Sequence, residues 1–257
     1  MDLGQRLMIA TPTHDGKVSI HYASCMADTI RLGGQIGITV VPVFLPGEAL
    51  IHHARNSLLK IAYEAQVDIL FIDSDQGWQA GWVFELLKSE KDFIGLPVRK
   101  KSEDEAYNVK LTRKAIIGEN GQMEVDGIGT GFLLLTQKAV KALWEAAPEY
   151  ISHGEPYRLV FDNKIKNGEL ISEDIVLCNN WQALGGSVWA DIKYTCNHVG
   201  TKVYGGNFGN FLDRINKAIV NEPDLTNLKN LKITSTDENG EFIRNDHGAT
   251  KNDTALC

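Results

Sequence analysis

Long hydrophobic runs and an excess of positive charge are both absent from this sequence of 257 residues. Its longest apolar stretches, such as ITVVPVFL at 38–45, have the length of a strand, whereas a membrane-spanning helix needs about 20 residues. The formal net charge is −7, which argues against a uniformly basic nucleic-acid binder but is compatible with a local basic patch. We therefore expect an acidic protein without a membrane span.

Cysteine is scarce, and the glycine-rich phosphate-binding loops of common nucleotide-binding folds are missing. The four cysteines are scattered and form no CxxC pair, so reduced thiols in a cytoplasm are the simplest interpretation. The N-terminal stretch lacks the charged-then-apolar pattern of a signal peptide, which also favours a cytoplasmic location. There is no Walker A sequence, and no GxGxxG between a strand and a helix.

Apolar strand-like segments alternate with segments of helical periodicity, which predicts an α/β fold with helices on both faces of a parallel sheet. The predicted strands are 6–12, 36–45, 67–72, 92–98, 131–136, 187–189 and 194–196. The predicted helices are 18–32, 49–65, 82–88, 137–147, 172–184 and 210–220. Beyond Glu222 the chain is polar and has few large apolar residues. We predict a single domain at 1–221 and a polar C-terminal tail at 222–257.

The segment ILFIDSDQGW at 69–78 places two carboxylates directly after a buried strand. Ligands of open α/β sheets bind at the carboxyl ends of strands, and residues i and i+2 of an extended chain share a side. Asp73 and Asp75 are therefore candidate ligands of Mg²⁺ or Mn²⁺ together with substrate phosphates. The competing interpretation is an Asx-type turn that caps the next helix.

A second acidic pair opens the predicted helix in ISEDIVLCNNW. Ser172 is a good N-cap residue, and Glu173 and Asp174 favour the positive end of the helix dipole. Helix capping alone accounts for all three residues. The functional interpretation gives one of the two carboxylates a second task as a general base.

The glycines of VDGIGTGFLLL and the residues of CNHVGTK are two further candidates. Gly129 and Gly131 allow a ligand to approach the backbone closely, or they form a tight turn with a bulge. His198 is a candidate metal ligand and Lys202 a candidate partner of a phosphate, although both residue types are common in surface loops.

Arg55 in HHARN lies on the predicted helix that leads to the two carboxylates. Its guanidinium is suited to pair with a phosphate or a carboxylate. A solvated helix face is the alternative.

The order of these motifs resembles that of the GT-A glycosyltransferases, especially the short enzymes of bacteria and bacteriophages. The resemblance rests on ATPT, ARN, the DxD strand, DGIGTGF, SED and a late HxG, and it spans residues 6–210. It implies a Rossmann-like mixed sheet flanked by helices, and a nucleotide-sugar donor, with a UDP-sugar favoured. The glycine-rich stretch lacks a tryptophan that is common in such enzymes, and HVGTK matches their late-His motifs only loosely.

The resemblance also assigns roles to individual residues. It implies Asp73, Asp75 and His198 as ligands of Mn²⁺ or Mg²⁺, and Asp174 or Glu173 as the catalytic base. The remaining implied contacts belong to the nucleotide-sugar: Thr11 and Pro12 at the nucleobase, Asp73 at the ribose, Arg55 at the ribose or diphosphate, and Gly129 and Gly131 at the sugar and acceptor pocket.

The acceptor and the stereochemical course stay open at the level of sequence. The basic segments VRKK at 98–101 and KLTRK at 110–114 suit a DNA phosphate backbone, so a hydroxymethylated DNA base is one hypothesis and a surface glycan or protein is another. A nucleotidyltransferase that uses the same metal–diphosphate site is the alternative enzyme. A sugar-binding viral protein without catalysis is the alternative outside enzymes.

Overall fold

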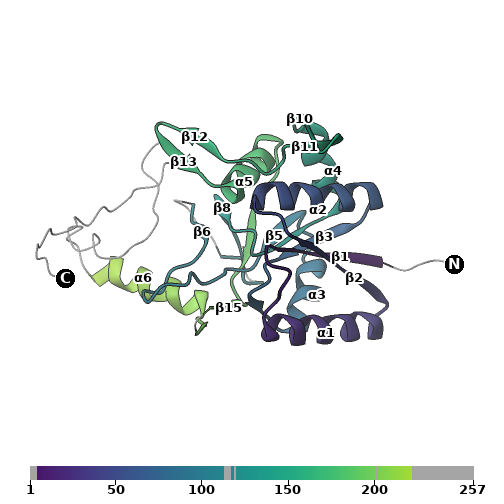
Figure 1. The fold of residues 1–257 in the computed structure, drawn as a ribbon. Helices are drawn as coiled ribbons and strands as arrows, with labels where there is room; N and C mark the ends of the chain where they lie inside the picture. Colours follow the sequence, from purple (N-terminus) through teal and green to yellow (C-terminus); the bar gives the residue numbers. More distant parts are fainter. Residues whose placement is uncertain (1–4, 113–116, 119, 201, 222–257) are drawn as a thin grey trace, which may run out of the picture.

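A twisted seven-stranded sheet forms the centre of the molecule, and helices cover both of its faces (Figure 1). The structure is a computed structural model, which describes residues 5–112, 117–118, 120–200 and 202–221. The strands lie in the order β2-β1-β3-β9-β5-β14-β7. In that order they are Ile38–Pro46, Gln5–Thr13, Asp68–Ile72, Phe132–Leu135, Phe93–Gly95, Trp189–Asp191 and Gln122–Glu124.

The sheet is mixed, as the resemblance implied. Strand β1 pairs in parallel with β2 and β3, and β14 pairs in parallel with β5. Strand β9 runs antiparallel to both of its neighbours, β3 and β5, and β7 runs antiparallel to β14. The prediction of a single α/β domain with a mixed sheet is therefore confirmed, whereas the purely parallel sheet expected from the alternation alone is wrong.

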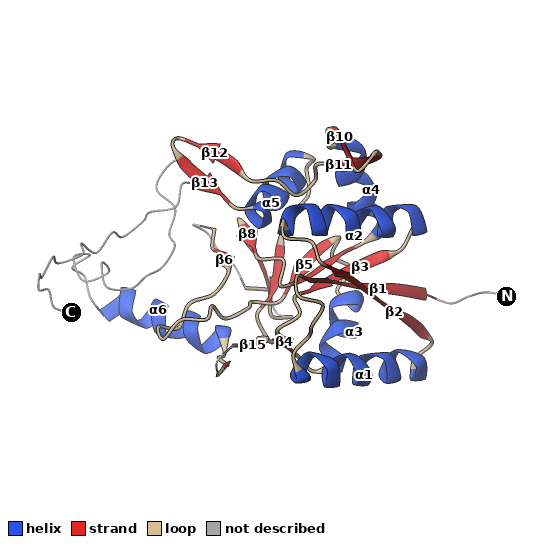
Figure 2. Ribbon diagram, viewed as in Figure 1, coloured by secondary structure: helices blue, strands red, loops and turns tan. Residues whose placement is uncertain are grey.

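Two apolar layers, one on each face of the sheet, hold the helices in place. Along β1, Leu7 and Ile9 belong to one layer and Met8 and Ala10 to the other, as the two-residue period of a strand buried on both faces requires. Figure 2 shows α1 and α3 on one face, and α2, α4 and α5 on the other. Among the described residues the helices are Ile20–Gln35 (α1), Ile51–Ala65 (α2), Ala80–Lys88 (α3), Gln137–Ala146 (α4), Glu173–Ala183 (α5) and Phe208–Asn221 (α6).

Short strands outside the main sheet shape the edge where the parallel strands end. Strand β4 pairs with β15, which pairs with β16, and this small sheet brings the late part of the chain beside the end of β3. The other small sheets pair β6 with β8, β10 with β11, and β12 with β13. Their bounds are Gln76–Gly77 (β4), Val109–Lys110 (β6), Gly127–Ile128 (β8), Glu149–Ser152 (β10), Glu155–Arg158 (β11), Lys164–Lys166 (β12), Glu169–Ile171 (β13), Asn197–Val199 (β15) and Val203–Tyr204 (β16).

Several details differ from the sequence predictions. The strand predicted at 194–196 lies instead at Asn197–Val199, and only Cys196 of the predicted range takes part in a bridge, with Val98. The two hairpins between 149 and 171 were not predicted at all. Within the described residues, no helix combines the length and apolarity that crossing a membrane requires. The predicted tail at 222–257 lies outside the described residues.

Candidate functional site

The end of β3 turns sharply and places both carboxylates of the DxD motif at the carboxyl edge of the sheet. The N–H of Asp73 donates to the carbonyl of Gly131 at 3.1 Å, and the N–H of Gln76 donates to the carbonyl of Asp73 at 3.1 Å. The next helix, α3, has Gln79 as its N-cap residue and no side-chain capping bond. The two aspartates therefore do not cap that helix, and the interpretation of the motif as a capping turn is wrong.

A buried arginine joins three carboxylates from different parts of the chain. Arg55 on α2 has a side chain that is only 5% exposed. Its Nη2 donates to Asp73 Oδ1 at 3.1 Å, and its Nη1 donates to Glu173 Oε1 at 2.6 Å and to Asp174 Oδ1 at 2.8 Å. The alternative of a solvated helix face for Arg55 is therefore wrong.

One guanidinium cannot balance three carboxylates, so the cluster holds two surplus negative charges if all of them ionise. Loss of water raises the pKa of Asp73, Arg55 opposes this rise, and the charges of Asp174 and Asp75 add to it. An added cation would stabilise the ionised form of every member. The electrostatics of this edge therefore favour a cationic ligand.

The acidic pair at the start of α5 faces this cluster. Ser172 occupies the N-cap position, but its side chain makes no capping hydrogen bond. Asp174 Oδ1 accepts a second hydrogen bond, from Thr130 Oγ1 at 2.5 Å, in addition to that from Arg55. Capping is therefore an incomplete account of this motif, because Glu173 and Asp174 reach the same arginine as Asp73.

A second polar cluster surrounds Asp75. Lys101 Nζ donates to Asp75 Oδ2 at 2.5 Å, and His198 Nε2 lies 3.3 Å from the same oxygen. Burial raises the pKa of Asp75, but the hydrogen bonds and charges of His198 and Lys101 outweigh this effect and lower it to about 2. His198 reaches the site because β15 pairs with β4 and the N–H of Val199 donates to the carbonyl of Asp75 at 2.8 Å.

The hydrogen bond at Nδ1 of His198 determines that the lone pair of the neutral ring lies on Nε2. Nδ1 lies 2.8 Å from the carbonyl oxygen of Arg99, which can only accept, so Nδ1 carries a proton in this contact. In the neutral ring Nε2 is then an acceptor that faces a carboxylate oxygen. Two acceptors at this distance need a proton or a metal ion between them, and a carbonyl bond at Nδ1 is the usual arrangement of a metal-binding histidine.

Asp75 Oδ2 and His198 Nε2 are suitably placed to supply part of the ligand shell of a metal ion. Neighbouring ligands of an octahedral Mg²⁺ with bonds of 2.0–2.1 Å lie about 3 Å apart, close to the 3.3 Å between Asp75 Oδ2 and His198 Nε2. No three His, Cys, Asp or Glu side chains of the described chain form a complete metal site. Mg²⁺ commonly binds one or two protein carboxylates and completes its shell with phosphates and water, so an incomplete set of this kind fits.

The structure places the other predicted residues around this edge without testing their roles. Thr11 and Pro12 are buried at the end of β1, and the hydroxyl of Thr11 contacts that of Tyr22. A Cβ added to Gly131 would lie 3.2 Å from Asp73 Oδ2, so this glycine makes room for the carboxylate. Lys202 instead pairs with Glu103, at 2.8 Å and 2.9 Å from its two oxygens.

A Cβ added to Gly129 would lie 2.9 Å from the Cβ of Asn108, so this position is closely packed against the preceding loop. Sequence reasoning missed two residues of the site, Lys101 and Thr130. Lys101 lies in the segment VRKK, which suggested contacts with DNA phosphates. Thr130 lies between the two glycines that were predicted to line the site.

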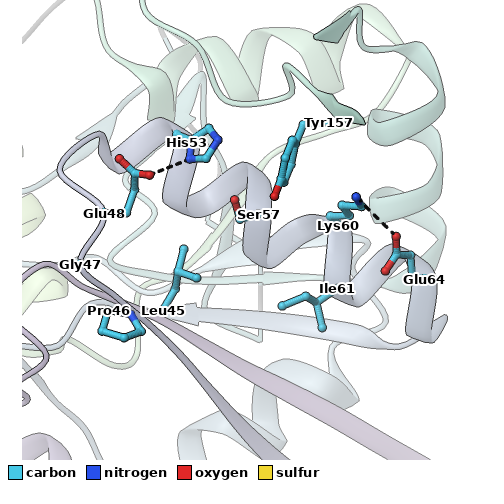
Figure 3. Close-up of a pocket in the computed structure, with 10 residues that line it drawn as sticks. All are labelled: Leu45, Pro46, Gly47, Glu48, His53, Ser57, Lys60, Ile61, Glu64 and Tyr157. Atoms are coloured by element: carbon cyan, nitrogen blue, oxygen red, sulfur yellow. Dashed lines mark hydrogen bonds and ion pairs between the residues drawn. The ribbon is translucent and has the colours of Figure 1, made fainter. Parts of the chain in front are cut away.

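A separate groove of about 490 Å³ lies on the other side of α2 (Figure 3). Its helix residues, from His53 to Glu64, point away from Arg55, because positions 53, 57, 60, 61 and 64 share one face at 100° per residue. Tyr157 and the turn after β2 close the groove. It is therefore distinct from the carboxylate clusters.

The comparisons with known proteins are limited to the fold. No protein-family model matches the sequence, and no curated protein matches it. The structure of A197 from STIV superposes with a TM-score of 0.50 at 15% identity, over 76% of this chain and 86% of that chain. This likeness supports a shared fold and carries no function with it.

Two other structures are similar at lower scores. One is a glycosyltransferase involved in the glycosylation of the major capsid of PBCV-1, with a TM-score of 0.33 at 14% identity over 54% of this chain and 65% of that chain. The other is the UTP-bound UGPase from Acinetobacter baumannii, with a TM-score of 0.37 at 14% identity over 88% and 81%. At these scores neither structure adds an argument.

Proposed function

We propose that the protein is a metal-dependent glycosyltransferase that moves a sugar from a nucleotide-sugar to a hydroxyl acceptor. The observation that carries the proposal is the meeting of Asp75 and His198 at the end of β3, beside the carboxylates that Arg55 holds together. Two ligands for one ion and a set of oriented carboxylates are what diphosphate departure and hydroxyl activation require.

In this proposal Asp75 and His198 bind Mn²⁺ or Mg²⁺. The ion, when bound, offsets the negative charge that develops on the departing diphosphate. Arg99 helps to orient His198, because its carbonyl accepts a hydrogen bond from Nδ1–H and leaves Nε2 as the nitrogen that would bind the ion. Asp73 is held by Arg55 through Oδ1, and its Oδ2 faces Gly131. Asp73 would contact the nucleotide or the shell of the ion from this fixed position.

Asp174 is the proposed general base. Arg55 and Thr130 both bind its Oδ1, so within the described contacts Oδ2 is the oxygen left to receive a proton from an acceptor hydroxyl. Arg55 contacts all three carboxylates of the cluster, Asp73, Glu173 and Asp174. Arg55 thus acts as a positioning residue, and the earlier expectation of a direct contact with the diphosphate is secondary in this proposal.

Calorimetry with UDP, GDP and ADP, each in Mn²⁺ and in EDTA, tests the proposal. We expect one nucleoside diphosphate, with UDP favoured, to bind at least tenfold more tightly with Mn²⁺, and Asp75→Asn to remove this difference. Lys138→Met is a suitable control, because it breaks an ion pair with Asp92 at the other end of the sheet. Equal affinities with Mn²⁺ and EDTA for every nucleotide, or no binding at all, would contradict the proposal.

The product separates the proposed reaction from nucleotidyl transfer. A glycosyltransferase releases a nucleoside diphosphate from a nucleotide-sugar, and it also releases it slowly when water replaces the acceptor. A nucleotidyltransferase instead forms pyrophosphate from a nucleoside triphosphate and a sugar phosphate. Release of UDP from a UDP-sugar supports the proposal, whereas release of pyrophosphate from UTP and a sugar phosphate would replace it with the alternative.

A further inference from the structure

Lys101 occupies the position at Asp75 where a divalent ion would bind. Its ammonium lies 2.5 Å from Asp75 Oδ2, the same oxygen that His198 Nε2 faces at 3.3 Å. An ammonium and a metal ion cannot share this oxygen closely, since both are cations. In the metal-free protein the lysine therefore places a positive charge directly at this carboxylate oxygen.

The loop around Lys101 is held at several points, and the Lys101 side chain is partly exposed. Arg99 and Tyr107 form an antiparallel bridge at the base of the loop, and the N–H of Lys100 donates to the carbonyl of Ala106 at 2.8 Å. The guanidinium of Arg99 donates to the carbonyl of Gly205 at 2.5 Å. The Lys101 side chain itself is 38% exposed.

Gly200 provides the surface along which the stem of Lys101 lies. A Cβ at residue 200 would lie 3.3 Å from Cδ and 3.5 Å from Cε of Lys101, so the glycine lets the stem pass close to the chain beside His198. A ligand oxygen bound to the same ion as Asp75 would lie about 3 Å from Oδ2, by octahedral geometry. The flexible four-carbon stem can cover that distance by side-chain rotation, without movement of the backbone.

We infer that Lys101 pairs with Asp75 when no metal is bound, and that it exchanges Asp75 for a diphosphate oxygen when a metal–nucleotide complex binds. This inference rests on the proposed function. The ligand class is a nucleoside diphosphate that arrives with its divalent ion. The exchange therefore favours binding of the metal together with a diphosphate over binding of free metal. Free metal competes with Lys101 for Asp75, whereas a diphosphate gives the displaced ammonium a new anionic partner.

Two titrations with opposite expected signs test the exchange. The first adds Mn²⁺ without nucleotide to the wild type, Lys101→Met and the control Lys138→Met, which removes a lysine at the same distance from an aspartate, Asp92 Oδ2 at 2.5 Å. Lys101→Met should bind Mn²⁺ about fivefold more tightly than the wild type, the upper range for loss of a competing ion pair at a partly exposed site. Lys138→Met should match the wild type.

The second titration adds UDP at saturating Mn²⁺. Lys101→Met should bind UDP about tenfold more weakly, which is the loss of one charge-assisted hydrogen bond. Lys101→Arg, which keeps the charge, should recover most of this loss. Unchanged or weaker Mn²⁺ binding by Lys101→Met would overturn the inference, and so would unchanged UDP binding.

Asp75→Asn separates failure of this inference from failure of the proposed function. Mn²⁺ binding that depends on Asp75 but is indifferent to Lys101 would overturn the exchange alone. Mn²⁺ and UDP titrations that Asp75→Asn leaves unchanged would overturn both, because the ion would then bind elsewhere.

Discussion

Replacing Arg55 by methionine should destabilise the protein strongly at neutral pH and less at acidic pH. The change keeps most of the apolar stem but removes the only cation that Asp73, Glu173 and Asp174 share among their described contacts. The three carboxylates would then face one another with exposed fractions of 33%, 15% and 21%. Removing one partner of a fully buried ion pair costs about 3–5 kcal/mol. With partial exposure we expect about 2–4 kcal/mol.

The pH dependence follows from the sign of the pKa shifts. Burial and its acidic neighbours already raise the pKa of Asp73, and Arg55 is the group that opposes this rise. In Arg55→Met the folded-state pKa of Asp73 should rise further above its unfolded value. A carboxylate with a raised pKa destabilises the fold most above its folded-state pKa, and the cost disappears as the pH falls to the unfolded value of about 3.8. The difference in unfolding free energy between wild type and variant should therefore shrink as the pH falls from 7 toward about 4.

Urea unfolding followed by tryptophan fluorescence at pH 7 and at about pH 4, near the unfolded pKa, measures this difference. Arg55→Lys retains a charge but lacks the forked geometry, so it should fall between the wild type and Arg55→Met. Lys138→Met, which breaks an exposed pair with Asp92, should cost less than about 1 kcal/mol. A cost below about 1 kcal/mol for Arg55→Met at pH 7, or a cost that is equal at both pH values, would refute the reasoning.

Three further predictions concern other parts of the structure. Asp174→Asn should lower turnover by a factor of about 10²–10⁴ with nucleotide binding nearly intact, while Glu173→Gln should have the smaller effect. Transfer rates within about threefold of wild type for both variants would indicate that the motif only caps the helix. Asp75→Asn should lower the free energy of unfolding of the metal-free protein by about 1–2 kcal/mol. In the wild type this contribution is present above the unfolded pKa of about 3.8 and is lost as the pH falls toward 2, so acid unfolding of both proteins measures it. Gly186→Ala should cost about 1–3 kcal/mol, because the new Cβ would lie 2.0 Å from the indole of Trp181, and an unchanged midpoint of thermal unfolding would show that the ring moves freely.

The buried strands and the position of the DxD motif were accessible from the sequence because they depend on local patterns. Strand β3 has almost no polar residue, so its boundaries could be predicted, and with them the position of the two aspartates at its carboxyl end. The direction of β9 could not, because this strand pairs antiparallel with both β3 and β5 after a long excursion of the chain. Alternation of strands and helices carries no information on such a reversal.

The residues that connect distant segments were the harder part of the site. The pattern of α2 placed Arg55 on a helix, but its three carboxylate partners come from two other segments, 18 to 119 positions away. Lys101 belongs to an irregular loop whose course depends on Arg99, Tyr107 and Gly205. Tertiary contacts of this kind have no periodic signature.

One missed hairpin did have a local signal. Asn167 and Gly168 separate β12 from β13 and have φ values of 53° and 83°. Asn-Gly between two short strands is the preferred sequence of a two-residue hairpin turn. The equivalent turn between β10 and β11 uses His153 and Gly154, with φ values of 50° and 83°, and histidine at the first position is a weaker indication.

Electron paramagnetic resonance of Mn²⁺ in a complex with the protein and UDP tests the proposed metal–diphosphate site most directly, because it identifies the nuclei that are coordinated to the ion. We predict hyperfine couplings to nitrogen from His198 and to phosphorus from the diphosphate in one and the same complex. His198→Gln should remove the nitrogen coupling alone, and Asp75→Asn should weaken binding of the ion itself. A complex without phosphorus coupling, or couplings that persist unchanged in both variants, would contradict a metal–diphosphate site at the end of β3.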